Sequence, residues 1–126
     1  MIILLYVGFG GAIGAVLRYG VILLFQDVLG LAGPYATLTV NILGSLVLGI
    51  IVGFSVTTWA ISPEFKAMLM VGILGGFTTF SAFSMDTVNL LQRDEIFIAF
   101  IYVLISVLVS ISSFFFSYSV CRQVLQ

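Results

Sequence analysis

The few charged residues of this chain are separated by four long apolar stretches. Four basic and five acidic side chains make up 7% of the 126 residues, whereas 62% of the residues are hydrophobic. Soluble domains carry about 25% charged residues, so this chain cannot cover a water-exposed surface. A membrane-spanning helix needs roughly 20 apolar residues, and suitable stretches cover residues 2–25, 35–58, 67–91 and 96–121. We therefore predict an all-α membrane protein with four transmembrane helices in one domain, residues 1–126.

The composition also excludes several classes of function. A net charge of −1 offers no basic surface that would attract nucleic acid. The single cysteine, Cys121, cannot form an internal disulfide, and without histidine the usual side-chain ligand sets for zinc or haem are missing. The sequence shows no nucleophile beside a base and no paired carboxylates at one depth, so we expect no enzyme. The amino terminus lacks a basic segment and a cleavage site, which predicts a retained membrane span.

The basic residues give only a weak signal for orientation. Alternating spans place Lys66 and Arg122 on the side of the amino terminus, and Arg93, alone or with Arg18, on the other side. The positive-inside rule needs an asymmetry to act on, so this count predicts that copies insert in both orientations and form an antiparallel homodimer. A fixed topology set by signals outside this count is the alternative. Because four helices enclose little space, we expect any path for a small solute to lie at a subunit interface.

One face of the second span carries polar and small residues at intervals of four. They are Thr37, Asn41, Ser45, Gly49 and Gly53. Small residues with this spacing let helices pack closely in lipid, which is the structural interpretation of the two glycines. Asn41 differs, because an amide inside the membrane is expensive without partners and its NH2 group offers two donors that suit an anion. We therefore predict that Asn41 lies on a solute pathway.

The fourth span has a comparable face of hydroxyl groups. Its members are Tyr102, Ser106, Ser110, Ser113 and Ser117. Their spacings of three and four residues place them on one side of a helix. A serine in a helix can also bond back to the carbonyl four residues earlier. Each serine alone therefore has a structural alternative, whereas the aligned set favours a second polar track.

The third span contains the most unusual segment of the chain, residues 72–84. A glycine pair, Gly75 and Gly76, precedes two threonines and regularly spaced phenylalanines. Paired glycines lower helix propensity, and hydroxyls can satisfy backbone groups that a break releases. We predict a break in the middle of the membrane, with released carbonyls that could bind a cation. An intact helix with a packing glycine pair is the alternative.

Phe80 and Phe83 lie three residues apart within this segment. Phenylalanine in a membrane protein usually packs or faces lipid, and that is the simpler interpretation. However, the edge of an aromatic ring carries the positive end of its quadrupole. Two rings turned edge-on to a pore could therefore hold a small anion without binding it strongly.

Two charged residues, Arg18 and Asp86, fall inside the predicted helical segments. Arg18 could extend its charge to the membrane surface, or it could give a vestibule a positive potential for anions. Asp86 could pair with Arg18 or cap a polar cluster. The sequence leaves these alternatives open.

The chain resembles the small bacterial fluoride channels of the Fluc or CrcB family over essentially its whole length. The resemblance rests on the motifs GGAIGAVLRY at 10–19, TLTVNILG at 37–44 and GGFTTFSAFS at 75–84, and on the track of Tyr102, Ser106 and Ser110. It implies an antiparallel homodimer of four-span subunits in the bacterial inner membrane. Two pores of such a dimer would conduct fluoride passively and release toxic intracellular fluoride.

The resemblance also implies roles for individual residues. Phe80 and Phe83 would present ring edges to fluoride, and the remaining pore residues would be Asn41, Thr37, Tyr102, Ser106 and Ser110. A structural sodium ion, which is not transported, would be held at the dimer centre by the backbone carbonyls of Gly75 and Thr78. Such a hard cation can be bound by carbonyl oxygens alone.

The sequence departs from the family pattern at three positions. Ala36 stands where glycine is common, Ala82 replaces a hydroxyl between the phenylalanines, and Asp86 replaces an expected glutamate. Any contact made through the missing hydroxyl is therefore not expected here.

Two other functions share some of these features. A proton-coupled antiporter of the small multidrug resistance type also has four short spans, but it needs a membrane-embedded carboxylate, for which Asp86 is the candidate. In a noncatalytic assembly factor, helix faces with glycines would suffice for packing, and two polar tracks would have no use. The fluoride channel is the function that the sequence favours.

Overall fold

The computed structural model describes residues 1–57 and 61–125, and these residues form four helical spans long and apolar enough to cross a membrane. The helices are α1 (Ile2–Leu23), α2 (Gly33–Thr57), α3 (Pro63–Ala67), α4 (Gly75–Phe77), α5 (Phe80–Gln92) and α6 (Ile96–Val124). A π-helical turn, Leu24–Val28, prolongs α1, and a second π-helical segment, Met68–Leu74, joins α3 to α4. The third span thus covers Pro63–Gln92. The prediction of four apolar helices is confirmed, although residue 58 of the second stretch lies outside the described residues.

The connections between the spans are short and contain turn and capping residues. Gly30 has a φ of 65°, which glycine adopts without steric cost, in the turn between the first two spans. Ser62 caps α3, because its side-chain oxygen accepts a hydrogen bond from the Phe65 N–H at 3.3 Å, and Pro63 occupies the first helical turn. These turn and cap signals separate the spans.

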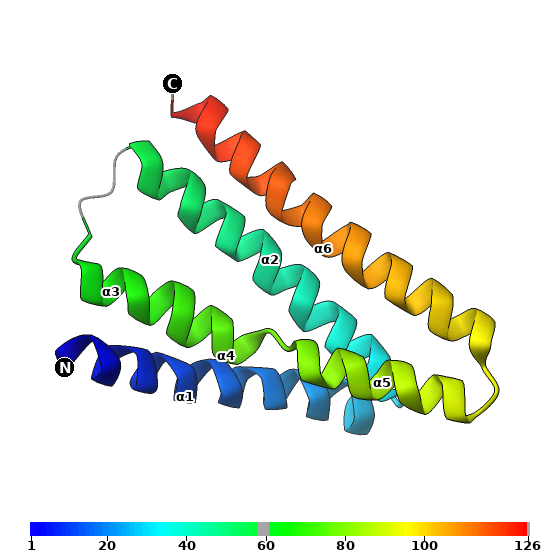
Figure 1. The fold of residues 1–126 in the computed structure, drawn as a ribbon. Coiled ribbons are helices and arrows are strands. Elements are labelled where there is room, and N and C mark those ends of the chain that lie inside the picture. The colour runs from blue at the N-terminus through cyan, green and yellow to red at the C-terminus, as the bar shows by residue number, and fades with distance from the viewer. Residues whose placement is uncertain (58–60, 126) are drawn as a thin grey trace.

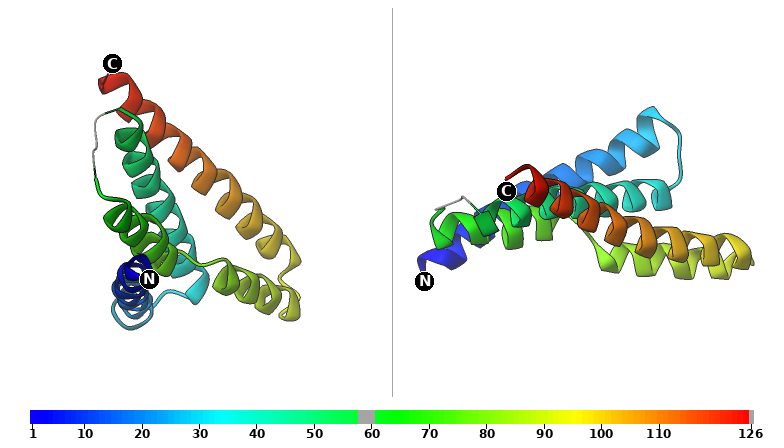
Figure 2. Two further views of the ribbon diagram at one scale, coloured as in Figure 1. Left: turned by 60° about the vertical axis from the view of Figure 1, so that its left-hand side comes forward. Right: turned by 90° about the horizontal axis from the view of Figure 1, so that it is seen from above.

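The spans form two close pairs (Figure 1). The helices α2 and α6 run side by side in the same direction, and α3, the π-helical segment and α4 lie along α1. Glycines allow both approaches: a Cβ on Gly53 would lie 2.7 Å from the Cys121 Cβ, and a Cβ on Gly76 would lie 2.6 Å from the Gly11 carbonyl oxygen. The start of α6 diverges from α2 and meets α5 instead (Figure 2).

The third span is broken after α4, as predicted. Thr78 and Thr79 adopt extended conformations, with φ and ψ of −80° and 158° and of −153° and 120°. The chain becomes helical again at Phe80, and Thr79 caps α5 by accepting a hydrogen bond from the Ala82 N–H at 3.1 Å. The glycine pair itself stays helical, and Gly76 packs on α1. The break is therefore made by the two threonines, with Gly76 supplying the helix contact beside it.

Most large apolar side chains point outwards, while few are buried inside the subunit. The buried cluster is small and consists of Phe83, Leu90, Ala99 and Tyr102. Apolar surface of this extent suits lipid or a second copy of the chain. Since the structure describes a single chain, the antiparallel homodimer stays a prediction.

Candidate functional site

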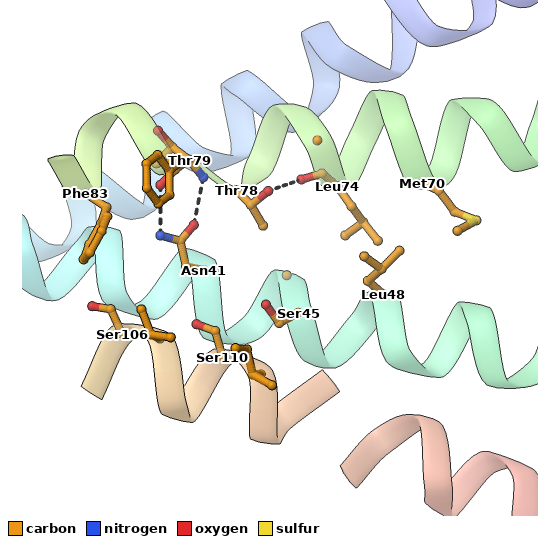
Figure 3. A pocket seen from close by; sticks show the side chains of 15 residues that line it. Asn41, Ser45, Leu48, Met70, Leu74, Thr78, Thr79, Phe83, Ser106 and Ser110 are labelled. Atoms are coloured by element: carbon orange, nitrogen blue, oxygen red, sulfur yellow. Dashed lines mark hydrogen bonds between the residues drawn. The ribbon is translucent and has the colours of Figure 1, made fainter. Parts of the chain in front are cut away.

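A cavity of about 420 Å³ lies where the break in the third span faces α2 and α6 (Figure 3). Its polar lining residues are Asn41, Ser45, Thr78, Thr79, Ser106 and Ser110. Its apolar lining includes both phenylalanines, Phe80 and Phe83, and Gly75 of the glycine pair. None of the described residues that line this cavity is charged. Five of the seven predicted pore residues thus meet at one place, and the two that do not line this cavity are Thr37 and Tyr102.

Asn41 holds the break to α2 through a two-way hydrogen bond. Its Nδ2 donates to the Thr79 carbonyl oxygen at 2.9 Å, and its Oδ1 accepts from the Thr79 N–H at 2.8 Å (Figure 3). These bonds satisfy a backbone segment that has left the helical pattern inside the membrane. An asparagine amide has two N–H donors, so one donor is left beyond the bond to Thr79. Asn41 therefore shapes the cavity and still has a donor to offer.

The break frees the two carbonyls that were predicted to bind a cation. In a continuous helix the Thr79 N–H would bond the Gly75 carbonyl, and the Ala82 N–H would bond the Thr78 carbonyl. The Thr79 N–H donates instead to Asn41, and the Ala82 N–H donates to the Thr79 hydroxyl. Both carbonyls thereby lose their helical partners at the carboxyl end of α4, where the helix dipole favours a positive charge. Carbonyl oxygens placed in this way fit a hard cation such as sodium.

The hydroxyls of Ser106 and Ser110 have no hydrogen-bond partner among the described residues, although both oxygen atoms are buried. Ser106 is only 7% exposed. A buried hydroxyl normally finds a partner, and Thr78, for example, donates back to the Leu74 carbonyl at 2.9 Å. Ser45 reaches the same cavity from the side of α2 that faces α6 (Figure 3). Ser106 and Ser110 are therefore donors without a partner in the wall of a cavity.

Three aromatic rings continue from the cavity toward the start of α6. The ring centroids of Phe80 and Phe83 are 5.3 Å apart, and those of Phe83 and Tyr102 are 5.5 Å apart. Phe80 is 77% exposed, whereas Phe83 is 9% exposed. Phe83 therefore belongs to the wall between helices of one subunit, and Phe80 presents most of its surface outside the chain.

Asp86 forms a buried cluster with two of the predicted track residues. Its Oδ2 accepts hydrogen bonds from the Thr37 hydroxyl at 2.6 Å and from the Tyr102 hydroxyl at 3.2 Å. All three side chains are 7% exposed or less. Of the two alternatives for Asp86, the structure shows the polar cluster and not a pair with Arg18. Thr37 does not line the 420 Å³ cavity.

A second cavity of about 680 Å³ lies beyond this cluster, between the starts of α2 and α6 and the end of α5. Asp86 and Tyr102 border its inner part, and Arg93 and Glu95 come from the connection between α5 and α6. Its α6 lining, Ile98, Ile101, Tyr102 and Ile105, directly precedes the α6 lining of the first cavity. The two cavities therefore follow one another along α6.

Arg18 lies on the other side of the break, on α1. Its Nη1 donates to the Thr78 carbonyl oxygen at 3.4 Å, and it lines a third cavity of about 450 Å³ together with Thr79 and Ser81. The sequence did not indicate this contact, because residues 60 positions apart are joined only by the fold. The apolar wall residues Leu48, Met70 and Leu74 of the first cavity were also missed, since nothing in their residue types marks them among other apolar residues.

Comparisons with known proteins agree with these features. Residues 5–118 match a family described as CrcB-like protein, Camphor Resistance (CrcB). The chain belongs to the CrcB family. A fluoride-specific ion channel FluC of Rhodospirillum centenum is 43% identical over 122 residues, which is 97% of each chain. Proteins with the same name from Geobacter sp. and Shewanella pealeana are 39% and 47% identical over 119 and 103 residues, or 94% and 82% of this chain and 96% and 82% of theirs.

Membership of the CrcB family confirms the resemblance found in the sequence. It also confirms that the chain is a multi-pass membrane protein of an ion-channel family and not an enzyme. The matched residues, 5–118, include most of each of the four spans and every candidate site residue. The roles of those individual residues stay predictions.

Proposed function

We propose that this protein is a fluoride-specific channel, through which toxic cytoplasmic fluoride leaves the cell passively. The names of its CrcB-family relatives support the choice of ion. The observation that carries the proposal is the pair of buried, unpartnered hydroxyls, Ser106 and Ser110, in a cavity lined by no charged residue of the described chain. Groups that lack a partner in the protein are suited to bind a partner that passes through.

The cavity offers an anion neutral hydrogen-bond donors and aromatic ring edges, each of which binds it weakly. The two serine hydroxyls and the remaining Asn41 N–H can donate hydrogen bonds that replace water around fluoride. The ring edges of Phe80 and Phe83 add weak positive potential. A channel must bind its ion well enough to admit it and weakly enough to release it. Neutral donors without a fixed cation in the cavity wall meet that requirement.

The proposed path follows α6 through both cavities. Their α6 linings extend from Ile98 to Ile111, a distance of about 20 Å at 1.5 Å per residue. That distance is a large part of a hydrocarbon core roughly 30 Å thick. Phe83 and Tyr102 form the wall between the cavities, and the hydroxyls of Thr37 and Tyr102 lie beside the track with their hydrogens donated to Asp86. Arg18 would give a vestibule on the far side of the break a positive potential.

The proposal places the channel in the bacterial inner membrane as an antiparallel homodimer with two pores. The exposed face around the break supports a partner, because Phe80 is 77% exposed and Gly75 is also exposed. A ring that lines the cavity while most of its surface lies outside the chain would be covered by a second copy. The weak bias of basic residues is compatible with insertion in both directions.

A structural sodium ion fits the same proposal. The carbonyls of Gly75 and Thr78 have lost their helical partners and come from the exposed region of the break. Two subunits would supply four such oxygens, which suits a cation that binds oxygen ligands without a charged side chain. The ion would tie the two breaks together and would not be transported.

A proton-coupled antiporter of the small multidrug resistance type is the second candidate. Asp86 favours it, because this carboxylate is buried within a span and borders the larger cavity. Against it, the carboxylate is already bound by two hydroxyl donors. The channel explains the unpartnered serines, which the antiporter does not use.

Fluoride efflux from liposomes that contain the purified protein tests the proposal. A potassium ionophore balances charge, and liposomes loaded with chloride are run in parallel. Rapid loss of fluoride with retention of chloride is the expected result. Absence of fluoride flux, together with uptake of an organic cation driven by a proton gradient, would overturn the channel in favour of the antiporter.

A further inference from the structure

Arg18 is a membrane-embedded cation whose contact with the break is not explained by the proposed vestibule. It lies within α1, is partly buried, and has no acidic partner within 4.0 Å among residues 1–57 and 61–125. Arginine inside a span is costly and normally pairs with an acid or with backbone carbonyls. The hydrogen-bond acceptor that Arg18 has in the described chain is the Thr78 carbonyl oxygen, at 3.4 Å. The hydrogen bond from Arg18 to the break therefore requires a separate explanation.

The break is held from two opposite sides. On the side of α2, Asn41 binds both the N–H and the carbonyl of Thr79. On the side of α1, Arg18 donates to the carbonyl of the preceding residue, Thr78. That carbonyl is one of the two freed from helical bonding, because the Ala82 N–H is taken by the Thr79 hydroxyl. Arg18 thus supplies positive charge to the same oxygen that the proposed sodium ion would bind.

Sharing this oxygen has an energetic consequence. A carbonyl oxygen has two lone pairs and can accept from two partners. Two positive charges on one oxygen repel each other, and the repulsion is strong where water is scarce. The guanidinium also stabilises the freed carbonyl at the carboxyl end of α4 when no other cation is present. The presence of Arg18 and the binding of an external cation should therefore oppose each other.

We propose that Arg18 is a built-in cation that positions the break by binding the Thr78 carbonyl, and that it sets how strongly the protein depends on external sodium. This inference rests on the sodium site of the proposed function and goes beyond it by assigning a residue that tunes the site. Loss of the Arg18 charge leaves the freed carbonyl without its internal partner. The break then relies more on sodium and binds it more tightly.

Thermal unfolding of the purified protein in detergent tests this role without any measurement of transport. The melting temperature is recorded at increasing sodium chloride, with N-methyl-D-glucamine chloride keeping the ionic strength constant. For Arg18→Gln we expect a lower melting temperature without sodium, a larger gain with sodium, and a midpoint at about tenfold lower sodium concentration. Arg18→Lys keeps the charge on a stem of similar length, so it should keep the wild-type midpoint.

A matched control removes a positive charge elsewhere. Arg122 is exposed at the end of α6, where its Nη1 donates to the Tyr118 hydroxyl at 3.3 Å. Arg122→Gln should therefore respond to sodium as the wild type does. If Arg18→Gln does not fold in either salt, Arg18→Lys carries the test, because a lower midpoint in this variant would overturn the role of charge.

The outcomes separate this inference from the function on which it rests. An unchanged midpoint and an unchanged sodium gain in Arg18→Gln, with a wild type that sodium stabilises, would overturn the role of Arg18 and leave the sodium site standing. A wild type that sodium does not stabilise would overturn the sodium site and this inference together. A separate measurement of fluoride efflux would still decide whether the protein is a fluoride channel.

Discussion

Two polar clusters lie one helical turn apart on α6 and differ in how their hydroxyls are used. Tyr102 and Thr37 both donate to the same carboxylate oxygen of Asp86. One turn further on, Ser106 and Ser110 are buried without a partner in the described chain. Hydroxyls that are satisfied inside the protein hold helices together, whereas unsatisfied ones at a cavity wall mark a place for a ligand. Both clusters contain buried hydroxyl oxygens, so the presence or absence of a hydrogen-bond partner is what distinguishes them.

The largest effect is expected from Asn41→Asp, because the Asn41 amide both holds the break and keeps one N–H donor for the anion. A carboxylate cannot donate to the Thr79 carbonyl, and it puts a negative charge beside the anion path. We expect fluoride efflux to fall by about a hundredfold or more, since one buried hydrogen bond and one like charge together amount to about 3 kcal/mol. Liposome efflux measures the loss, and the melting temperature reports the weakened break.

Gln123→Glu serves as the control for Asn41→Asp. It makes the same chemical change from amide to carboxylate at an exposed position near the end of α6. Efflux through this variant should match the wild type. If Asn41→Asp conducted fluoride as well as Gln123→Glu does, the amide of Asn41 would not lie on the path.

Regular features of the molecule could be predicted from the sequence. Most charged residues lie at or near the ends of the four spans, because lipid excludes charge. The helix bounds therefore fall close to the predicted stretches. The break was predicted from the composition of residues 72–84, because local propensity acts on neighbouring residues. Its exact position was not, since Gly76 is needed for packing against Gly11 on α1 and only the fold reveals that contact.

Contacts across spans could not be derived from residue spacing. Helical periodicity placed Tyr102 with the serines of the fourth span, and the family resemblance added Thr37 to the same track, but neither assigns a hydrogen-bond partner. That both hydroxyls donate to Asp86 depends on how α2, α5 and α6 approach one another. For the same reason the sequence left open whether Asp86 pairs with Arg18, although the two residues bind different groups in the fold.

The next largest effect should follow from Thr37→Val, which removes a satisfied hydroxyl. Valine has nearly the shape of threonine but cannot donate to Asp86, so the buried carboxylate loses its 2.6 Å hydrogen bond. A hydrogen bond to a charged group is worth about 2 kcal/mol, and we expect the stability of the protein to fall by about that amount. Thermal unfolding measures the change.

Thr39→Val is the matched control for Thr37→Val. The Thr39 hydroxyl bonds back to the Tyr35 carbonyl at 2.8 Å in an exposed part of the same helix. Its loss should change the stability by less than about 0.5 kcal/mol, as is usual for exposed positions. Equal effects of the two variants would mean that the Asp86 cluster does not stabilise the fold.

Ser106→Ala should show the opposite pattern, with lost transport and unchanged stability. Its hydroxyl has no partner in the described chain, so alanine removes no internal bond. We expect about tenfold lower fluoride efflux, which corresponds to one hydrogen bond of about 1.4 kcal/mol to the passing ion. Ser84→Ala is the control, because the Ser84 hydroxyl is exposed and bonds back to the Phe80 carbonyl at 3.0 Å. Wild-type efflux through Ser106→Ala would remove this serine from the path.

The smallest effect is expected from Tyr102→Phe, which tests the boundary between the two clusters. Phenylalanine keeps the ring that lies 5.5 Å from Phe83 but loses the bond to Asp86, whose length of 3.2 Å indicates a weaker interaction than that of Thr37. We expect a stability loss of about 1 kcal/mol and a smaller decrease in efflux than for Ser106→Ala. If efflux instead fell as far as in Ser106→Ala with stability unchanged, the Tyr102 hydroxyl would act on the ion, and the boundary would move one turn toward the larger cavity.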